Sequence, residues 1–426
     1  LSYNLNANLP DPQEVYGALP ALEEFKSCLR QGAHSPLVVE EENCYYLKRI
    51  YEARASILHH WKRLTFSCTT EADPSDFQQL THEQRAALEM ALSHSPFILT
   101  GGPGTGKTYT ASCILKALLK SKPHQINRIA IAAPTGKAAL HLETTLKKAV
   151  DLKAEAMTLH RLCNKSEGML PYDLYLVDEA SMIDLELMAK FLGKIRSGAR
   201  LILLGDPDQL PPVECGSLFK ELCGTASHVA KLTHCLRAEL KELVDCAKAL
   251  LTTGEFLPSE AVEVHTSDSL ALEEMLPFFP KGAETFSPQL LSDFNRFRIL
   301  SPMRKGPYGV EAVNRQILQK LWKSRGGSIF PVPILITAND PVLKLFNGET
   351  ALLMTRHSPL EPPHIDDRIY FSDGRNIPAL LLPHYELAYC ITVHKSQGSE
   401  FDHVLLLLGD DPLSRKRELL YTAATQ

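Results

Sequence analysis

A glycine-rich octapeptide in this chain has the residue types that hold the phosphates of a nucleotide. Glycines let backbone N–H groups turn toward phosphate oxygens, and a helix that begins where the loop ends adds the positive end of its dipole. The octapeptide fits the pattern G-x-x-x-x-G-K-[ST] with Gly101, Gly102, Pro103, Gly104, Thr105, Gly106, Lys107 and Thr108. We expect Lys107 to reach the β- and γ-phosphates and the Thr108 hydroxyl to bind Mg²⁺. The other interpretation is a glycine-rich turn without function, and the complete pattern argues against it.

An acidic pair follows the apolar stretch Asp173–Val177 further along the chain. Asp178 and Glu179 would lie at the carboxyl end of a buried strand, where open α/β sheets bind their ligands. We assign Asp178 to Mg²⁺ binding and Glu179 to the general base that activates the attacking water. Such a pair alone is usually a solvated turn, but the phosphate loop upstream favours the catalytic interpretation.

Three further residues are expected at the nucleotide. Gln209 follows the next apolar run and can contact a γ-phosphate or the attacking water. Gln84 lies in the first turn of a helix that Thr81 would cap, and its amide offers an adenine edge a donor beside an acceptor. Tyr109 directly follows the phosphate loop. Without that loop, a polar turn would be the simpler interpretation of Gln209, and the start of a surface helix would be the simpler interpretation of Gln84.

Three polar stretches have the chemistry of nucleic-acid contacts. Each combines a hydroxyl with a Lys, Arg or His at what reads as the start of a helix, which suits a backbone phosphate. The candidate residues are Pro134, Thr135, Gly136, Lys137, Thr158, His160, Arg161, Thr392, His394, Lys395 and Ser396. Each stretch alone is better explained as a capped helix on a solvated face, but three in one protein with a phosphate loop favour nucleic-acid binding.

The composition is that of a globular protein with more than one hydrophobic core, at 426 residues, 44% apolar and 22% charged. The 45 Lys and Arg against 50 Asp and Glu give a net charge of −5. This excludes a histone-like nucleic-acid binder but allows a local basic channel. None of the ten cysteines forms a C-x-x-C pair, and no apolar run reaches the roughly 18 residues of a membrane span. We therefore expect a cytoplasmic protein with reduced thiols and no membrane contact.

The order of apolar patterns predicts an α/β fold. In a small N-terminal α+β domain over residues 1–75, Ser35–Lys48 predicts a hairpin and Ile50–Phe66 a helix. Short strands then alternate with helices over residues 76–228, which is the rhythm of a parallel sheet covered on both faces.

A second set of α/β patterns covers residues 229–426. It contains a predicted helix over Glu239–Leu251 and predicted strands that include Leu387–Ile391. Within it, residues 330–383 change to short strands and turns, which predicts a small all-β insertion.

Taken together, the motifs resemble those of superfamily 1 DNA helicases, and most closely the RecD type, the alpha subunit of the RecBCD exonuclease (exodeoxyribonuclease V). They stand in order over about Leu80–Gln426 as GGPGTGKT, APTGKAA, TLHRL, VDEASMID, LGDPDQLPPVE and TVHKSQGSEFD. The resemblance implies two RecA-like P-loop lobes with ATP between them and an SH3-like insertion in the second lobe. It also implies single-stranded DNA running across both lobes and ATP-driven movement in the 5′→3′ direction.

The resemblance also implies roles for single residues and partners. Arg237 corresponds to the arginine that reaches the γ-phosphate, and Glu400 to the same nucleotide cleft. Arg304 and Asn314 fall in a second-lobe stretch typical of the family. Residues 1–75 resemble the domain that docks RecD on its partners, which implies a complex with RecB-like and RecC-like subunits in double-strand break repair and recombination. The shortness of this segment favours that type over a stand-alone RecD-like helicase.

Two departures from the family leave alternatives open. Gln426 stands where the family has an arginine, which predicts slow hydrolysis or reliance on Arg237. The stretch Leu162–Tyr172 leaves little room for a hairpin that splits the duplex, so translocation is better supported than strand separation. A P-loop ATPase of another class, such as an AAA-type remodeller, and a subunit with weak turnover and a mainly structural role remain the alternatives. No nuclease motif is evident.

Overall fold

The structure is a computed structural model, and it describes most of the chain from residue 38 onward. The described residues are 38–41, 44–68, 79–121, 126–150, 154–212, 217–237, 241–253, 259, 261–264, 273, 275–326, 329–340, 342–382, 384–409 and 416–426. Most of the predicted N-terminal domain therefore lies outside the described residues. None of the helices in the described ranges has the length and apolar character needed to span a bilayer.

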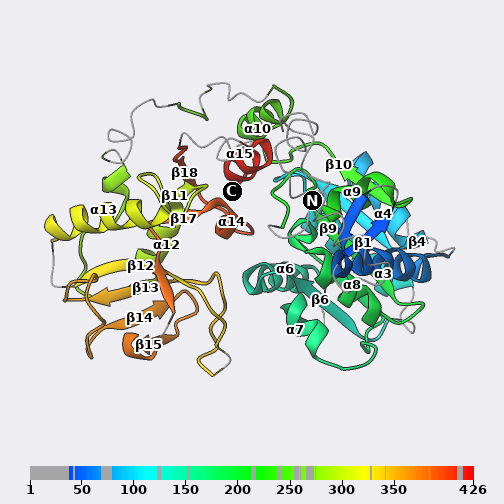
Figure 1. The fold of residues 1–426 in the computed structure, drawn as a ribbon, viewed down its shortest axis with the longest axis horizontal. Coiled ribbons are helices and arrows are strands. Elements are labelled where there is room, and N and C mark those ends of the chain that lie inside the picture. The colour runs from blue at the N-terminus through cyan, green and yellow to red at the C-terminus, as the bar shows by residue number, and fades with distance from the viewer. Residues whose placement is uncertain are drawn as a thin grey trace, which may run out of the picture.

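The first lobe is built on a parallel sheet with helices on both faces, as the sequence predicts (Figure 1). The strand order is β10-β5-β9-β8-β6-β7. The strands are β5 (Phe97–Gly101), β6 (Ile129–Ala133), β7 (Glu155–Thr158), β8 (Leu174–Val177), β9 (Arg200–Gly205) and β10 (Val229–Leu232). Every residue of β5, β6, β8 and β9 is buried, which explains their continuous apolar runs.

Two hydrophobic cores fill the two faces of this sheet. One face packs against α4 (His82–Ser93), α5 (Lys107–Ser121) and α6 (Gly136–Ala149). The other packs against α3 (Lys48–Leu64), α7 (Leu159–Asn164), α8 (Leu185–Lys194) and α9 (Leu218–Thr225). Residues alternate between the two cores, as Ile98 and Leu99 do on β5, because successive side chains of a strand point to opposite faces.

The predicted N-terminal hairpin and helix are confirmed where the structure describes them. β1 (Val38–Glu41) pairs antiparallel with β2 (Cys44–Leu47), and α3 follows directly. The buried residues Ala53, Ile57 and Leu64 of α3 join the core of the first lobe. A short pair, β3 (Phe66–Ser67) with β4 (His94–Ser95), ties the end of α3 to the lobe.

The second lobe contains a three-stranded parallel sheet of order β17-β11-β18. Its strands are β11 (Phe297–Ser301), β17 (Cys390–Thr392) and β18 (His403–Leu406). Its helices are α10 (Lys241–Thr253), α12 (Pro288–Arg296), α13 (Val310–Lys323), α14 (Val393–Ser396) and α15 (Arg417–Ala424). In Figure 1, α10 and α15 lie between the two lobes.

The predicted all-β insertion is a five-stranded antiparallel sheet of order β15-β14-β13-β12-β16. Its strands are β12 (Phe330–Ile336), β13 (Thr350–Thr355), β14 (Arg368–Phe371), β15 (Asn376–Pro378) and β16 (Tyr385–Leu387). The predicted turns at Gly348 and Gly374 have φ angles of 86° and 87°, a conformation that glycine adopts without strain.

Two boundaries differ from the sequence prediction. The stretch Leu387–Ile391 was predicted as one strand, and this is wrong, because β16 pairs with β12 of the insertion while β17 pairs with β11. The insertion therefore extends to Leu387. β10 lies within the predicted second segment 229–426, yet it pairs parallel with β5 at the edge of the first sheet. We accordingly propose that the first lobe ends after Leu232.

The link between β16 and β17 is held by two buried side chains. The Asn314 amide donates to the carbonyls of Leu387 and Cys390, at 3.0 and 2.8 Å, and its oxygen accepts from the Cys390 N–H at 2.9 Å. Arg298 donates to the Ala388 carbonyl, and burial lowers its pKa to about 10. A residue that the family resemblance implied thus has a structural role here.

We predict that Asn314→Ala lowers the free energy of unfolding by about 2–4 kcal/mol, because it leaves buried backbone groups without partners. Urea unfolding in a Trp61→Phe background would let Trp322, on the same helix, report on the second lobe alone. The matched control is Asn376→Ala, whose side chain bonds Arg368 at the surface and should cost less than about 1 kcal/mol. Equal losses of unfolding free energy in the two variants would contradict this structural role of Asn314.

Candidate nucleotide site and nucleic-acid interface

The phosphate loop has the predicted context of a strand, a loop and a helix. It leaves β5 at Gly101, and α5 begins at Lys107. Gly104 and Gly106 have φ angles of 71° and 83°, which side chains rarely adopt. A Cβ on Gly104 would also lie 2.7 Å from the Cys235 sulfur. Both the backbone conformation and this close neighbour therefore require glycine.

The segment after β10 lies against the phosphate loop. The Leu236 N–H donates to the Gly104 carbonyl at 2.8 Å, and the Cβ of Arg237 lies 3.6 Å from the position of a Cβ on Gly104. The Arg237 guanidinium pairs with Glu400 of the second lobe at 3.3 Å. Two residues that the family resemblance linked to the nucleotide are therefore adjacent. Both side chains are exposed, so this pair is weak and a nucleotide phosphate can displace it.

Lys107 has hydrogen bonds within its own loop. Its ammonium donates to the carbonyls of Gly101 and Gly102 at 2.6 and 3.1 Å. Its positive charge also acts on three carboxylates, those of Asp178, Glu179 and Asp206, which follow β8 and β9. The carboxyl ends of neighbouring parallel strands thus bring the predicted acids to the predicted lysine.

Burial opposes ionisation of these acids. It raises the pKa of Asp178 and of Asp206 above the usual range. Burial and the nearby charge of Asp178 raise the pKa of Glu179 as well, and Lys107 only partly offsets them. Glu179 also has a φ of 52°, a strained conformation for a residue with a side chain, and strain of this kind often marks functional sites. These carboxylates are therefore poorly stabilised as anions, and a bound cation would favour their ionised forms.

The donor set fits a hard cation such as Mg²⁺. The carboxylates of Asp178 and Glu179 are oxygen ligands, and Thr108, with its hydroxyl, is the second residue of α5. Ser181 Oγ, two residues after Glu179, and Gln209 Oε1, in the turn after β9, are buried and have no hydrogen-bond partner among the described residues. Oxygen-rich sites with unpaired polar atoms suit Mg²⁺ and its bound waters.

Gln84 caps its helix and also faces the phosphate loop. Thr81 and Gln84 form a capping box, in which the Gln84 side-chain oxygen accepts from the Thr81 N–H at 3.1 Å. The amide nitrogen is buried, has no hydrogen-bond partner within the part of the chain that the structure describes, and lies 2.9 Å from the position of a Cβ on Gly106. A free donor therefore remains beside the phosphate loop. Tyr109, which directly follows the phosphate loop, is exposed in the first turn of α5.

The second lobe contacts the turn that carries Gln209. The Tyr421 hydroxyl donates to the Asp206 carboxylate at 2.9 Å and lies 3.0 Å from the position of a Cβ on Gly102. The Leu210 N–H donates to the Thr422 hydroxyl at 2.8 Å, and the Gln397 amide donates to the Leu210 carbonyl at 3.1 Å. Residues from two motifs of the second lobe therefore form hydrogen bonds with both ends of the Asp206–Leu210 turn of the first lobe.

The three predicted nucleic-acid stretches share one local structure. Thr135, Thr158 and Thr392 are the N-caps of α6, α7 and α14, and each hydroxyl accepts from a backbone N–H of the first helical turn. The capped-helix interpretation is thus correct for the local structure. It does not remove the binding chemistry, because a hydroxyl that accepts one hydrogen bond can still donate its own proton to a phosphate.

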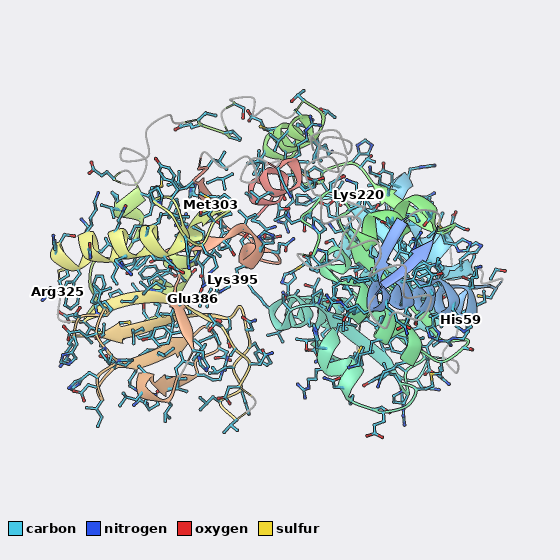
Figure 2. All side chains as sticks on the ribbon, viewed as in Figure 1. His59, Lys220, Met303, Arg325, Glu386 and Lys395 are labelled. Carbon is cyan, nitrogen blue, oxygen red and sulfur yellow. The ribbon has the colours of Figure 1, made fainter. Side chains whose placement is uncertain are left out.

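The cations of these stretches differ in their surroundings. Lys137 donates to the Ser399 hydroxyl of the second lobe at 2.9 Å, and Lys395 pairs with Glu386 at 2.8 Å (Figure 2). His160 and Arg161 are exposed on α7, and Pro134 is half-buried. His394 is half-buried, and burial lowers its pKa.

Three structural features bear on the predicted DNA binding and strand separation. Ser396 is fully buried and donates to the Val393 carbonyl, so its hydroxyl is not exposed in this structure, and its role as a DNA contact stays a prediction. Gly136 lies against the exposed ring of Phe346 from the insertion, with 3.2 Å between a Cβ on the glycine and Cδ1. The stretch Leu162–Tyr172, all of which is described, contains no strand that could form a separating hairpin.

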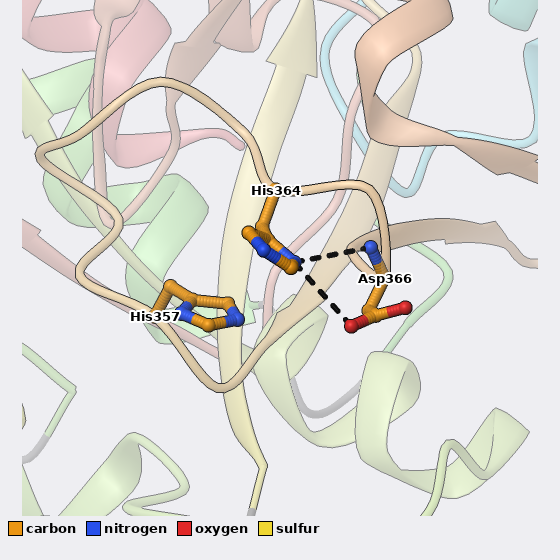
Figure 3. A group of neighbouring side chains, drawn as sticks. All are labelled: His357, His364 and Asp366. Carbon is orange, nitrogen blue, oxygen red and sulfur yellow. Dashed lines mark hydrogen bonds and ion pairs between the residues drawn. The ribbon is translucent and has the colours of Figure 1, made fainter.

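Some polar side chains were missed by the sequence reasoning. The sequence motifs assigned no role to Asp206 or to Glu386. A group in the insertion, His357, His364 and Asp366, brings two imidazoles and a carboxylate together on the loop between β13 and β14 (Figure 3). All three are exposed, and the spacing of 357, 364 and 366 gives no recognised motif.

Comparison with known proteins agrees with this geometry. Residues 79–269 match the family described as AAA domain, and residues 387–425 match the UvrD-like helicase C-terminal domain. The chain is 36% identical to the RecBCD enzyme subunit RecD of Mycolicibacterium smegmatis, over 81% of this chain and 69% of that protein. The RecD subunit of Mycobacterium tuberculosis is 34% identical, over 81% of this chain and 67% of that protein.

A relative that is named as a DNA helicase is also similar. The ATP-dependent RecD2 DNA helicase of Deinococcus radiodurans is 31% identical, over 82% of this chain and 48% of that protein. The matches to the two RecD subunits extend over about two thirds of their length and most of this chain. The chain therefore belongs to the RecD family of superfamily 1 helicases.

Proposed function

We propose that this chain is an ATP-dependent DNA helicase motor that moves 5′→3′ along single-stranded DNA as the RecD-like subunit of a RecBCD-type complex. Its family supports the helicase activity, since the relatives are named RecBCD enzyme subunit RecD and ATP-dependent RecD2 DNA helicase. The names of the subunits also support RecB-like and RecC-like partners in DNA repair.

The observation that carries the motor interpretation is the contact of Tyr421, Thr422 and Gln397 with the turn Asp206–Leu210. These second-lobe groups touch the part of the first lobe that holds Gln209 and lies beside Lys107 and the acids. A change of charge at the γ-phosphate would therefore alter hydrogen bonds between the lobes. If each lobe holds a different nucleotide, opening and closing moves the strand.

We propose the following roles at the nucleotide. Lys107 would leave its own loop carbonyls for the β- and γ-phosphates, and Arg237 would leave Glu400 for the γ-phosphate. Thr108 and Asp178 would hold Mg²⁺, which supplies positive charge to the phosphates. Glu179 would accept the proton of the attacking water.

The proposal predicts ATP turnover that single-stranded DNA stimulates and unwinding of a 5′-tailed but not a 3′-tailed duplex, measured with the complex of this chain and its partners. Lys107→Gln should reduce turnover about 10²-fold or more, because it removes a charge that stabilises the transition state. Turnover that ignores single-stranded DNA would point to another class of ATPase. Unwinding from the 3′ tail alone, lost in Lys107→Gln, would contradict the direction.

A second prediction concerns pH. Because the pKa of Glu179 is raised, this group keeps its proton to higher pH than an ordinary glutamate, and a general base must lose it. The acid limb of kcat/KM for ATP should therefore lie above the usual pKa of about 4.5, with activity falling as the pH drops through the raised value. Glu179→Gln should lose about 10²–10⁴-fold in kcat together with this limb. Glu186→Gln, at an exposed position of α8, should retain both.

A third prediction concerns coupling between the lobes. Tyr421→Phe removes the hydrogen bond to Asp206 and keeps the ring, so stimulation of turnover by single-stranded DNA should fall about tenfold while nucleotide binding persists. Tyr389→Phe is the matched control, because its buried hydroxyl has no partner among the described residues. Equal stimulation in wild type and Tyr421→Phe would show that this bond does not transmit the signal.

A further inference from the structure

One carboxylate holds two of the second lobe's cations. Glu386 Oε1 accepts from Arg304 Nη2 at 2.7 Å, and Oε2 accepts from Lys395 Nζ at 2.8 Å. Lys395 follows the N-cap of α14, and Arg304 lies in the turn after β11, so the two cations come from segments far apart in sequence. Glu386 is the group that brings them together.

The backbone fixes the position of this carboxylate. Glu386 lies on β16, in register with Leu335 of β12, so its main chain is part of the insertion sheet. The link that follows β16 is held by Asn314 and Arg298, which bond the carbonyls of residues 387, 388 and 390. The long side chains of Arg304 and Lys395 can move away from the carboxylate, whereas the main chain of Glu386 is fixed in the sheet.

The carboxylate is charged and partly shielded from water. Its side chain is 31% exposed, and that of Lys395 is 28% exposed. Partial burial alone would raise the pKa of Glu386, but the hydrogen bonds and charges of Lys395 and Arg304 outweigh it and hold the pKa below its usual value. Two cations and one anion leave a net charge of +1 on the group.

The group lies where a DNA strand is proposed to pass. In Figure 2, Lys395 and Glu386 lie on the side of the second lobe that faces α6, whose first turn carries Lys137. A phosphate that approaches Lys395 meets N–H donors already bonded to a carboxylate. Carboxylate and phosphate are both anions that bind such donors, so they compete for them.

We propose that Glu386 is a positioning residue that weakens the hold of the second lobe on the phosphates of single-stranded DNA by keeping Arg304 and Lys395 bonded to its carboxylate. This inference rests on the proposed function of the chain as a DNA motor. A motor must release each phosphate before the next step. When a phosphate leaves, the Glu386 carboxylate accepts hydrogen bonds from Arg304 and Lys395 again, so neither cation is left unpaired. Glu386 thus lowers the affinity of the second lobe for single-stranded DNA and speeds the release of the strand.

The test is Glu386→Gln in the full chain with its partners, measured by binding of a fluorescent oligothymidylate at several salt concentrations. Removal of the competing charge should raise affinity about threefold to tenfold at low salt. It should also steepen the dependence of log affinity on log salt by about 0.7, the value of one added phosphate contact on a single strand. Turnover at saturating DNA should fall, because release becomes slower.

Three variants separate this role from a merely structural one. Glu386→Asp keeps the charge and should stay near wild type. Glu386→Gln combined with Lys395→Ala should lose the gain in affinity. Asp402→Asn changes the net charge equally but frees Arg296, an exposed cation that is not among the proposed DNA contacts, and should leave the salt dependence unchanged.

The outcomes distinguish this inference from the proposed function. If the wild-type protein does not bind single-stranded DNA, the proposed function fails. If wild type binds and Glu386→Gln binds more weakly, the carboxylate supports the cations and the inference is overturned. Equal affinity and equal salt dependence in the two proteins would also overturn it.

Discussion

The structure depends on keeping three carboxylates at the edge of one parallel sheet. Asp178, Glu179 and Asp206 lie there because β8 and β9 are neighbours, and burial resists their ionisation. The charge of Lys107 from the adjoining loop offsets part of this cost but not all of it. A nucleotide with Mg²⁺ would bring further positive charge, so ligand binding is coupled to the protonation of the site itself.

The same electrostatic arrangement links the two lobes. Asp206 is both one of the buried acids and the acceptor for the Tyr421 hydroxyl, so a change in its protonation alters a hydrogen bond that crosses between lobes. Leu210, four residues later, bonds Thr422 and Gln397 through its backbone. A single turn therefore lies beside Lys107 and the buried acids on one side and is held by the second lobe on the other.

Local patterns allowed much of this architecture to be predicted. The phosphate loop, the Thr81 cap and the acidic pair each depend on residues within a few positions of one another, and all lie in the expected strand, loop or helix. The contacts that were missed join distant positions, such as Tyr421 with Asp206, 215 residues apart, and Glu386 with Arg304, 82 apart. No periodicity or spacing encodes such pairs, because they arise only when separate elements pack together.

At the predicted DNA contacts, a structural role in helix capping and a functional role in phosphate binding do not exclude each other. Thr135, Thr158 and Thr392 each cap a helix, which fixes the first turn and points its N–H groups outward. The same exposed helix start that requires a cap is also a place where an anion binds. Capping and phosphate recognition therefore favour the same residue at the same position. Only the charged neighbours, Lys137, Arg161 and Lys395, separate a DNA-binding turn from an ordinary one.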